Sequence, residues 1–305
     1  MPTFMRRDQV RYVHNVCRFH NRWCITSHIE SSTHKTSWTK MLIAQLADTH
    51  LSDPLMDDPI SHSRMECLRT AVNAINKLDP SPSIIIHTGD MVQNRTHSEY
   101  KLAQILLSDL QAPLYVVPGN RDSRRMLRET FDLPGNRNEP VLYSIDTHEL
   151  RLIALDTQSR DTRKGDLDEF RLRWLENTLN TNKSKPTAIF MHHPPVPITT
   201  STFPWQFIRE ETREEVSAII SRHPQVIRIF CGHSHRLFRS SIATAEVSTV
   251  TSLAADLRMD DKNPLQDRDA VYHTHTLKGG SFITKTHFVP MLINHKPMHK
   301  DPPIG

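Results

Sequence analysis

The sequence predicts an α/β protein in which two β-sheets pack together and helices cover their outer faces. Short apolar runs alternate along the chain with longer segments whose apolar residues recur at helical spacing. One pair of runs, Val141 to Asp146 and Leu150 to Asp156, is separated only by Thr147-His148-Glu149, which indicates a hairpin and not a strand–helix–strand unit. A chain of 305 residues can bury a large core in such an arrangement.

Five apolar runs are expected to be central strands: Leu42 to Leu46, Ile84 to His87, Leu114 to Val117, Ala188 to Met191 and Val226 to Phe230. Four amphipathic helices are expected among them, at Ser63 to Leu78, Leu102 to Leu110, Leu167 to Leu179 and Arg209 to Ser221. Towards the end of the chain, Ser240 to Leu253 predicts paired strands that close the second sheet. A late hairpin is expected from Val271 to Val289, turning at Gly279-Gly280.

Side chains of the metal-binding type follow each of the five central strands: Asp48-Thr49-His50, Gly89-Asp90, Gly119-Asn120, His192 and Gly232-His233-Ser234-His235. The carboxyl ends of strands in an open α/β sheet converge on one crevice, so these residues can meet there. Three carboxylate or amide oxygens and four imidazoles are too few for two closed cages. They suit two adjacent ions that share a bridging carboxylate and keep positions open for water and substrate.

Each residue alone has a plainer explanation. Asp48, Asp90 and Asn120 could each cap a turn or a helix. His193 follows His192 directly, and because adjacent residues of an extended segment point in opposite directions, we expect a supporting or structural role for it. Most other histidines are expected at the surface and carry no functional signal: His62, His97, His148, His223, His273, His275, His287, His295 and His299.

Taken together, five motifs in this order resemble the calcineurin-like metallophosphoesterases, and within them the bacterial class III cyclic nucleotide phosphodiesterase and glycerophosphodiesterase group. The motifs are Asp48-x-His50, Gly89-Asp90, Gly119-Asn120-x-Asp122, His192-His193-Pro194-Pro195 and Gly232-His233-x-His235. The resemblance runs from about Met41 to about Phe288. It implies a four-layer α/β/β/α sandwich.

The resemblance also implies a ligand set for two divalent ions. Carried over residue by residue, the first ion would be bound by Asp48, His50, Asp90 and His235, and the second by Asp90, Asn120, His192 and His233. Two such cations neutralise a phosphate, lower the pKa of a bound water and so support hydroxide attack. Mixed nitrogen and oxygen ligands permit Mn, Fe, Zn or Co.

Arg121 departs from the resembling proteins, which usually have histidine after the Gly-Asn pair to contact the phosphate and protonate the leaving oxygen. Arginine stays charged near neutral pH and cannot supply that proton, but it can bind phosphate. We therefore expect Arg121 to bind phosphate without being the general acid; alternatively, it points to solvent or pairs with a carboxylate such as Asp122. Asp122 itself is expected to support the site or to cap the next helix.

The sequence thus predicts a phosphodiesterase of small molecules, with cyclic nucleotides (3′,5′-cyclic AMP or 2′,3′-cyclic nucleotides) as the first expectation for its substrate. A glycerophosphodiesterase is the alternative, since one fold serves both substrates. A third possibility, from another class, is a metal-binding or ligand-sensing protein with weakened catalysis. It follows only from the departure at Arg121.

Charge gives no indication of a nucleic-acid partner. The net charge is +4, but residues 1–40 alone carry +5, so the rest of the chain is near neutral. No stretch approaches the roughly 20 apolar residues that a membrane helix requires. The expected partner is a small phosphodiester, with no nucleic-acid polymer and no membrane; a homo-oligomer is conceivable through residues 255–290, which can form a cap or dimer contact in related proteins.

Residues 41–290 are the expected phosphoesterase domain, and residues 291–305 a tail. Residues 1–40 are expected to be a disordered extension, or translation from an upstream start that is not used; a transit peptide is a further alternative. Their Cys17-x2-His20-x3-Cys24-x3-His28 run does not have the spacing of a familiar zinc module. The other cysteines, Cys67 and Cys231, are far apart and are expected to be buried and reduced, as in a cytoplasmic protein.

Overall fold

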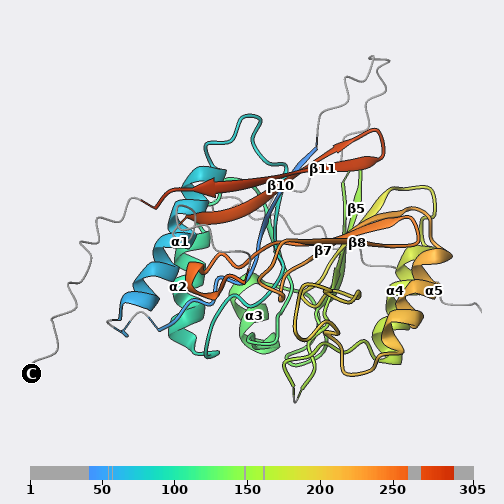
Figure 1. The fold of residues 1–305 in the computed structure, drawn as a ribbon, viewed down its shortest axis with the longest axis horizontal. Coiled ribbons are helices and arrows are strands. Elements are labelled where there is room, and N and C mark those ends of the chain that lie inside the picture. Colours follow the sequence, from blue (N-terminus) through green and yellow to red (C-terminus); the bar gives the residue numbers. More distant parts are fainter. Residues whose placement is uncertain are drawn as a thin grey trace, which may run out of the picture. The chain divides into compact units, whose positions relative to one another are not determined.

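The computed structural model describes residues 41–291, except 54, 57, 148, 161 and 260–268. Its helices and strands form four layers, in the order helices, sheet, sheet, helices (Figure 1). The predicted α/β/β/α sandwich is therefore confirmed. The predictions for residues 1–40, including the Cys17 to His28 run, lie outside the described residues, as does nearly all of the 291–305 tail.

The first sheet has the strand order β11-β10-β1-β2-β3. Its strands are β1 (Leu42–Leu46), β2 (Ile84–His87), β3 (Leu114–Val116), β10 (Ala270–Lys278) and β11 (Ser281–Val289). Strands β1, β2 and β3 are parallel, whereas β10 pairs antiparallel with β1. Its outer face is covered by α1 (Pro59–Ile75), α2 (His97–Leu107) and α3 (Arg124–Phe131). The late hairpin was predicted; its place beside β1 was not.

The second sheet has the order β4-β5-β6-β7-β9-β8. Its strands are β4 (Leu142–Asp146), β5 (Arg151–Leu155), β6 (Thr187–Phe190), β7 (Val226–Cys231), β8 (Phe238–Ile242) and β9 (Ala245–Thr249). Helices α4 (Glu169–Asn180) and α5 (Thr212–Ser221) pack on its outer face. The predicted hairpin is β4–β5, and the predicted closing strands are β8 and β9.

A buried apolar layer joins the two sheets face to face. Ile43 and Ile86 of the first sheet pack there against Leu152, Phe190 and Phe230 of the second. All five side chains are completely buried. The carboxyl ends of β1, β2 and β3 therefore lie beside those of β6 and β7, which places the five polar motifs at one end of the sandwich.

One helix was not expected, and one expectation is wrong in part. Helix α3 was not expected from the sequence because four of its eight residues are charged and only three are apolar. The histidines expected at the surface are not all there: His223, His273 and His275 are at most 4% exposed. The described helices include none that is long and apolar enough to cross a membrane.

A chain that begins at Met41 should fold and keep its activity. Met41 is buried and its carbonyl oxygen accepts a hydrogen bond from the Leu277 amide, so the contacts of β1 are complete from this residue. Thermal unfolding and phosphodiester hydrolysis should both match the full chain. An insoluble truncated protein, or an inactive one, would show that residues 1–40 belong to the folded domain.

Candidate metal centre

The structure brings all seven predicted ligand residues together at the carboxyl ends of the two sheets. Asp48 and His50 follow β1, Asp90 follows β2 and Asn120 follows β3. The remaining three residues, His192, His233 and His235, follow β6 and β7 of the second sheet. The site is therefore assembled from both sheets.

The first group of side chains contains Asp48, His50 and His235. The Nε2 atoms of His50 and His235 are 3.3 Å apart, and His235 Nε2 is 3.4 Å from Asp48 Oδ1. One oxygen of Asp90, Oδ2, lies 3.6 Å from His50 Nε2. The ligand atoms of Asp48, His50 and His235 lie within 4.8 Å of one another, close enough to bind one ion.

The second group contains Asn120, His192 and His233. His192 Nε2 is 3.2 Å from Asn120 Oδ1 and 3.2 Å from His233 Nδ1. The same Asp90 Oδ2 that faces His50 is also 3.5 Å from His192 Nε2. This single oxygen lies between both groups, which is the position that a bridging ligand requires.

The hydrogen bonds of the rings show that these residues fit cations. His50 Nδ1 is 2.9 Å from Gln93 Oε1, and His235 Nδ1 is 2.8 Å from the Leu257 carbonyl oxygen. Since both partners are acceptors, both Nδ1 atoms carry hydrogen, and the two Nε2 atoms face each other, where an ion could bind them both. Metal-binding histidines are commonly oriented in this way by a carbonyl oxygen.

The electrostatics of the site also favour the binding of cations. Asp48 and Asp90 are at most 3% exposed, and no Lys or Arg among the described residues forms an ion pair with either. Burial lowers the pKa of His192, but the Asp90 carboxylate outweighs this effect and raises the pKa to about 9. The negative field that favours a proton on this ring also favours a divalent cation.

Backbone geometry sets these residues apart as well. Five predicted ligands have positive φ angles, namely Asp48, His50, Asp90, His233 and His235, with values between 44° and 66°. Residues other than glycine adopt this left-handed backbone region uncommonly, and such backbone strain concentrates at functional sites. Short-range propensity does not explain five such residues around one point.

His193 lies close enough to His192 and His233 to share an ion with them, but its ring nitrogens already bond to the protein. Its Nδ1 is 2.8 Å from Thr157 Oγ1 and its Nε2 is 3.0 Å from the Arg163 carbonyl oxygen, so both nitrogens have protein partners. Burial, followed by the neighbouring His192, lowers the pKa of His193 to about 3, which keeps the ring neutral. These contacts favour the structural role that the sequence analysis expected.

The carboxylate of Asp122 is bound by hydrogen bonds within the protein. Its carboxylate accepts hydrogen bonds from the amides of Met91 and Gly119 and from the Tyr100 hydroxyl. Burial and the charge of Asp90 raise the pKa of Asp122 to about 6. Of the two roles expected for Asp122, the helix cap is excluded because Ser123 caps α3. Asp122 instead fixes the two loops that carry Asp90 and Asn120.

Arg121 is partly exposed beside this loop. Its backbone amide donates to Asp90 Oδ1 at 2.6 Å. Its guanidinium makes no hydrogen bond or ion pair with any residue in the described ranges, Asp122 included. The side chain is therefore available for a ligand or for solvent.

Two supporting residues were missed by the sequence analysis. Gln93 orients the His50 ring, as described above. Arg64 of α1 donates to the His50 carbonyl oxygen and forms a two-point ion pair with Asp256, at 3.0 and 2.7 Å. Leu257, whose carbonyl orients His235, directly follows Asp256. No sequence pattern marked either residue, because both act through contacts between distant segments.

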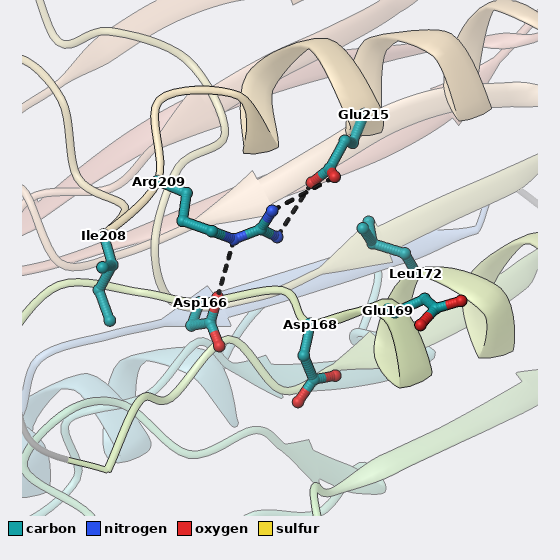
Figure 2. Close-up of a pocket in the computed structure, with 7 residues that line it drawn as sticks. All are labelled: Asp166, Asp168, Glu169, Leu172, Ile208, Arg209 and Glu215. Carbon is teal, nitrogen blue, oxygen red and sulfur yellow. Dashed lines mark hydrogen bonds and ion pairs between the residues drawn. The ribbon is translucent and has the colours of Figure 1, made fainter.

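A separate cavity of about 390 Å³ lies between α4 and α5 and contains none of the predicted site residues. Figure 2 shows Arg209 between Asp166 and Glu215, bound to both by ion pairs. The guanidinium thus links two acidic side chains, and the cavity is lined by an ion-pair network next to the loop before α5.

Comparison with known proteins agrees with the fold and the site. A family profile described as calcineurin-like phosphoesterase matches residues 41–237. The chain belongs to this family, whose members are hydrolases with a binuclear centre of divalent metals. The predictions of the family and of a metal-dependent phosphoester hydrolase are confirmed.

Relatives within the family carry two kinds of name. A probable glycerophosphodiester phosphodiesterase of Arcobacter nitrofigilis is 32% identical over 73% of this chain and 83% of its own length. The 3′,5′-cyclic adenosine monophosphate phosphodiesterase of Escherichia coli K12 is 25% identical over 65% of this chain and 70% of its own. A dimetal phosphatase from Danio rerio shares the fold, with a TM-score of 0.60 and 14% identity over 82% of this chain and 99% of its own.

Replacing His192 should be far more damaging to metal binding than replacing His193. We expect His192→Ala to lose one ion and about a hundredfold or more in activity, because its Nε2 faces Asp90 and Asn120. His193→Ala removes contacts only to Thr157 and Arg163 and should mainly lower the unfolding temperature. Metal analysis of the two purified variants shows which histidine is a ligand. Equal metal loss in both would mean that His193 also binds metal.

Proposed function

We propose that this protein is a phosphodiesterase of small molecules, with two divalent ions held by the seven residues described above. The single observation that carries the proposal is Asp90 Oδ2, which faces His50 on one side and His192 on the other at nearly equal distances, 3.6 and 3.5 Å. The first ion would be bound by Asp48, His50, His235 and Asp90. The second would be bound by the shared Asp90 together with Asn120, His192 and His233.

The bound ions would supply charge neutralisation of the phosphate and acidification of water. The chain provides the rest. Asn120 is a neutral ligand, so the centre keeps more positive charge for an anionic substrate than it would with another carboxylate. Arg121 follows it in the chain, and its guanidinium, which has no partner among the described residues, can bind a phosphate oxygen. The mixed ligands permit Mn, Fe, Zn or Co.

A second cavity approaches the Asn120 loop, although none of the seven predicted ligands lines it. This cavity of about 980 Å³ is lined by Gln158, Arg124, Arg160 and Phe170, among others. The Gln158 amide donates to the Gly119 carbonyl oxygen at 2.7 Å, so the cavity begins next to the Asn120 loop. Its volume is in the range of small-molecule sites. Phe170 and Arg160 line it, whereas the Arg124 guanidinium is held by a two-point ion pair with Asp156.

We propose cyclic nucleotides as the substrates, on the strength of the motifs and of relatives named cyclic nucleotide phosphodiesterases. Glycerophosphodiesters are the second candidate, because two relatives named for that activity are 32% and 30% identical to this chain. The buried, unpaired thiols of Cys67 and Cys231 support the proposal of a cytoplasmic protein.

Parallel assays of one protein preparation, divided and loaded with different metals, test this proposal. The substrates are 3′,5′-cyclic AMP, 2′,3′-cyclic nucleotides, glycerophosphoethanolamine and bis(4-nitrophenyl) phosphate, each with Mn, Fe, Zn or Co. The highest kcat/KM should fall on a cyclic nucleotide; a higher value on the glycerophosphodiester would move the assignment to the second candidate. No turnover of any diester with any of these metals would leave a metal-binding or sensing protein.

Arg121→Ala should lower activity on activated and poor diesters by similar factors, about tenfold to a hundredfold. The reason is that a guanidinium stabilises phosphate charge in both reactions but protonates neither leaving group. Rates on bis(4-nitrophenyl) phosphate and on a natural diester give the comparison, with the exposed Arg125→Ala on α3 as the matched control. A loss confined to poor leaving groups would assign protonation to this position, and unchanged rates would place Arg121 in solvent.

A further inference from the structure

Gln45 is a polar side chain in the middle of an apolar strand. It lies in β1 between Ala44 and Leu46, which pack towards the helices, and it is completely buried. Its neighbour on the same face is Ile43, part of the apolar layer between the sheets. Burying an amide there costs free energy unless its hydrogen bonds are made, so packing alone does not explain a glutamine at this position.

The amide makes three hydrogen bonds, and one of them crosses between the sheets. Nε2 donates to Thr88 Oγ1 at 3.1 Å and to the Cys231 carbonyl oxygen at 3.0 Å, while Oε1 is 3.0 Å from His275 Nε2. Thr88 and His275 belong to the first sheet and its strand ends, whereas Cys231 ends β7 of the second. Gln45 thereby ties the two sheets together through one side chain.

Both residues that accept from the Gln45 amide, Thr88 and Cys231, are also linked to the proposed metal ligands. The Thr88 carbonyl oxygen is 2.8 Å from His192 Nδ1 and so fixes the orientation of that ring. Cys231 is followed by Gly232 and His233, and the His233 amide donates to Asp48 Oδ2 at 3.1 Å. The metal ligands come from two sheets, so their relative position depends on contacts of this kind.

His275 sets which way the Gln45 amide faces. The Thr284 hydroxyl is 2.9 Å from His275 Nδ1, and the same hydroxyl accepts a hydrogen bond from Arg228 at 2.9 Å. Its hydrogen is therefore directed to Nδ1, which leaves Nε2–H to donate to Gln45 Oε1. If the Gln45 amide were flipped, its N–H donors would face the Nε2–H donor of His275, and no hydrogen bond could form between them. A residue of the β10–β11 hairpin (Figure 1) thus orients Gln45, although the family profile ends at residue 237.

We propose that Gln45 is a positioning residue of the metal centre and that His275 of the C-terminal hairpin holds it in the working orientation. Gln45 sets the distance between the ligands of the first sheet and those of the second. The inference rests on the binuclear centre proposed above and adds to it a specific role for the inter-sheet layer and for a strand outside the family motifs.

The test compares Gln45→Leu and His275→Phe with Ile43→Val, a control on the same strand and the same face that makes no side-chain hydrogen bond. For each, the unfolding temperature, the stoichiometry and affinity for Mn²⁺, and kcat and KM on bis(4-nitrophenyl) phosphate are measured. We expect Gln45→Leu to weaken binding of at least one ion about tenfold or more and to lower kcat with little change in KM. His275→Phe should act in the same direction, and the double variant should lose less than the sum of the two.

A merely structural role predicts a different pattern, in which all three variants unfold at lower temperature while folded protein keeps wild-type metal affinity and kcat. That pattern would overturn the inference. If Gln45→Leu does not fold, His275→Phe and Thr284→Val decide by the same criteria. Wild-type protein that binds no Mn²⁺ would refute the proposed function itself. Two ions bound by the wild type, with the same affinity and kcat in every variant, would refute only the role of Gln45.

Discussion

Asp90→Ala should lose both metal ions together and reduce diester hydrolysis at least about a thousandfold. One carboxylate oxygen of Asp90 faces both ligand groups, so neither group is complete without it. The expected result is a folded protein with less than one ion per chain at metal concentrations that saturate the wild type. Elemental analysis after gel filtration gives the count.

The exposed Asp109→Ala, at the end of α2, is the matched control for this variant and should keep both ions. Retention of one ion at full occupancy in Asp90→Ala would contradict the bridging position. The ligand sets would then have to be two separate groups, and Asp90 would belong to only one of them.

Gly119→Ala should disable the same metal centre although it replaces none of the predicted ligands but only a neighbouring loop glycine, which is not itself a ligand. A Cβ at this position would lie 2.2 Å from Asp90 Oδ1 and 2.3 Å from the Asp90 amide nitrogen, far inside normal contact distance. The Asp90 carboxylate or the Asn120 loop must therefore move, and we expect about a hundredfold loss of activity with weakened metal binding. Metal titration and rates on bis(4-nitrophenyl) phosphate measure both effects.

Gly165→Ala is a suitable comparison, since its Cβ would lie 2.7 Å from His193, whose ring nitrogens bind only protein atoms. It should lower stability by about 1–3 kcal/mol and leave metal affinity much closer to wild type. Equal metal loss in the two variants would show that general disorder of the loops, not displacement of Asp90, causes the defect.

The convergence of the five motifs could be predicted from sequence because it follows from a rule of sheet topology. Asp48, Asp90 and Asn120 come directly after buried parallel strands, and the ends of such strands meet. The apolar runs were long enough to locate the strands. Helix α3 escaped prediction because charged residues such as Arg124 and Glu129 outnumber its buried ones.

The supporting contacts could not be predicted in the same way. Gln93, Arg64 and Gln45 act on residues that are 43, 14 and 186 positions away in the chain, and no local pattern connects such pairs. The burial of His275 was also missed, because its partner strand was not known to be β1. Long-range pairing, and not local propensity, decides which polar residues become part of the site.

The most direct test of the central claim is anomalous diffraction from crystals of the protein grown with Mn²⁺. The binuclear centre predicts two anomalous peaks about 3.5–4 Å apart, with Asp90 Oδ2 between them, one beside His50 and His235 and the other beside Asn120 and His192. A single peak at saturating Mn²⁺, or two peaks that do not share Asp90, would contradict it.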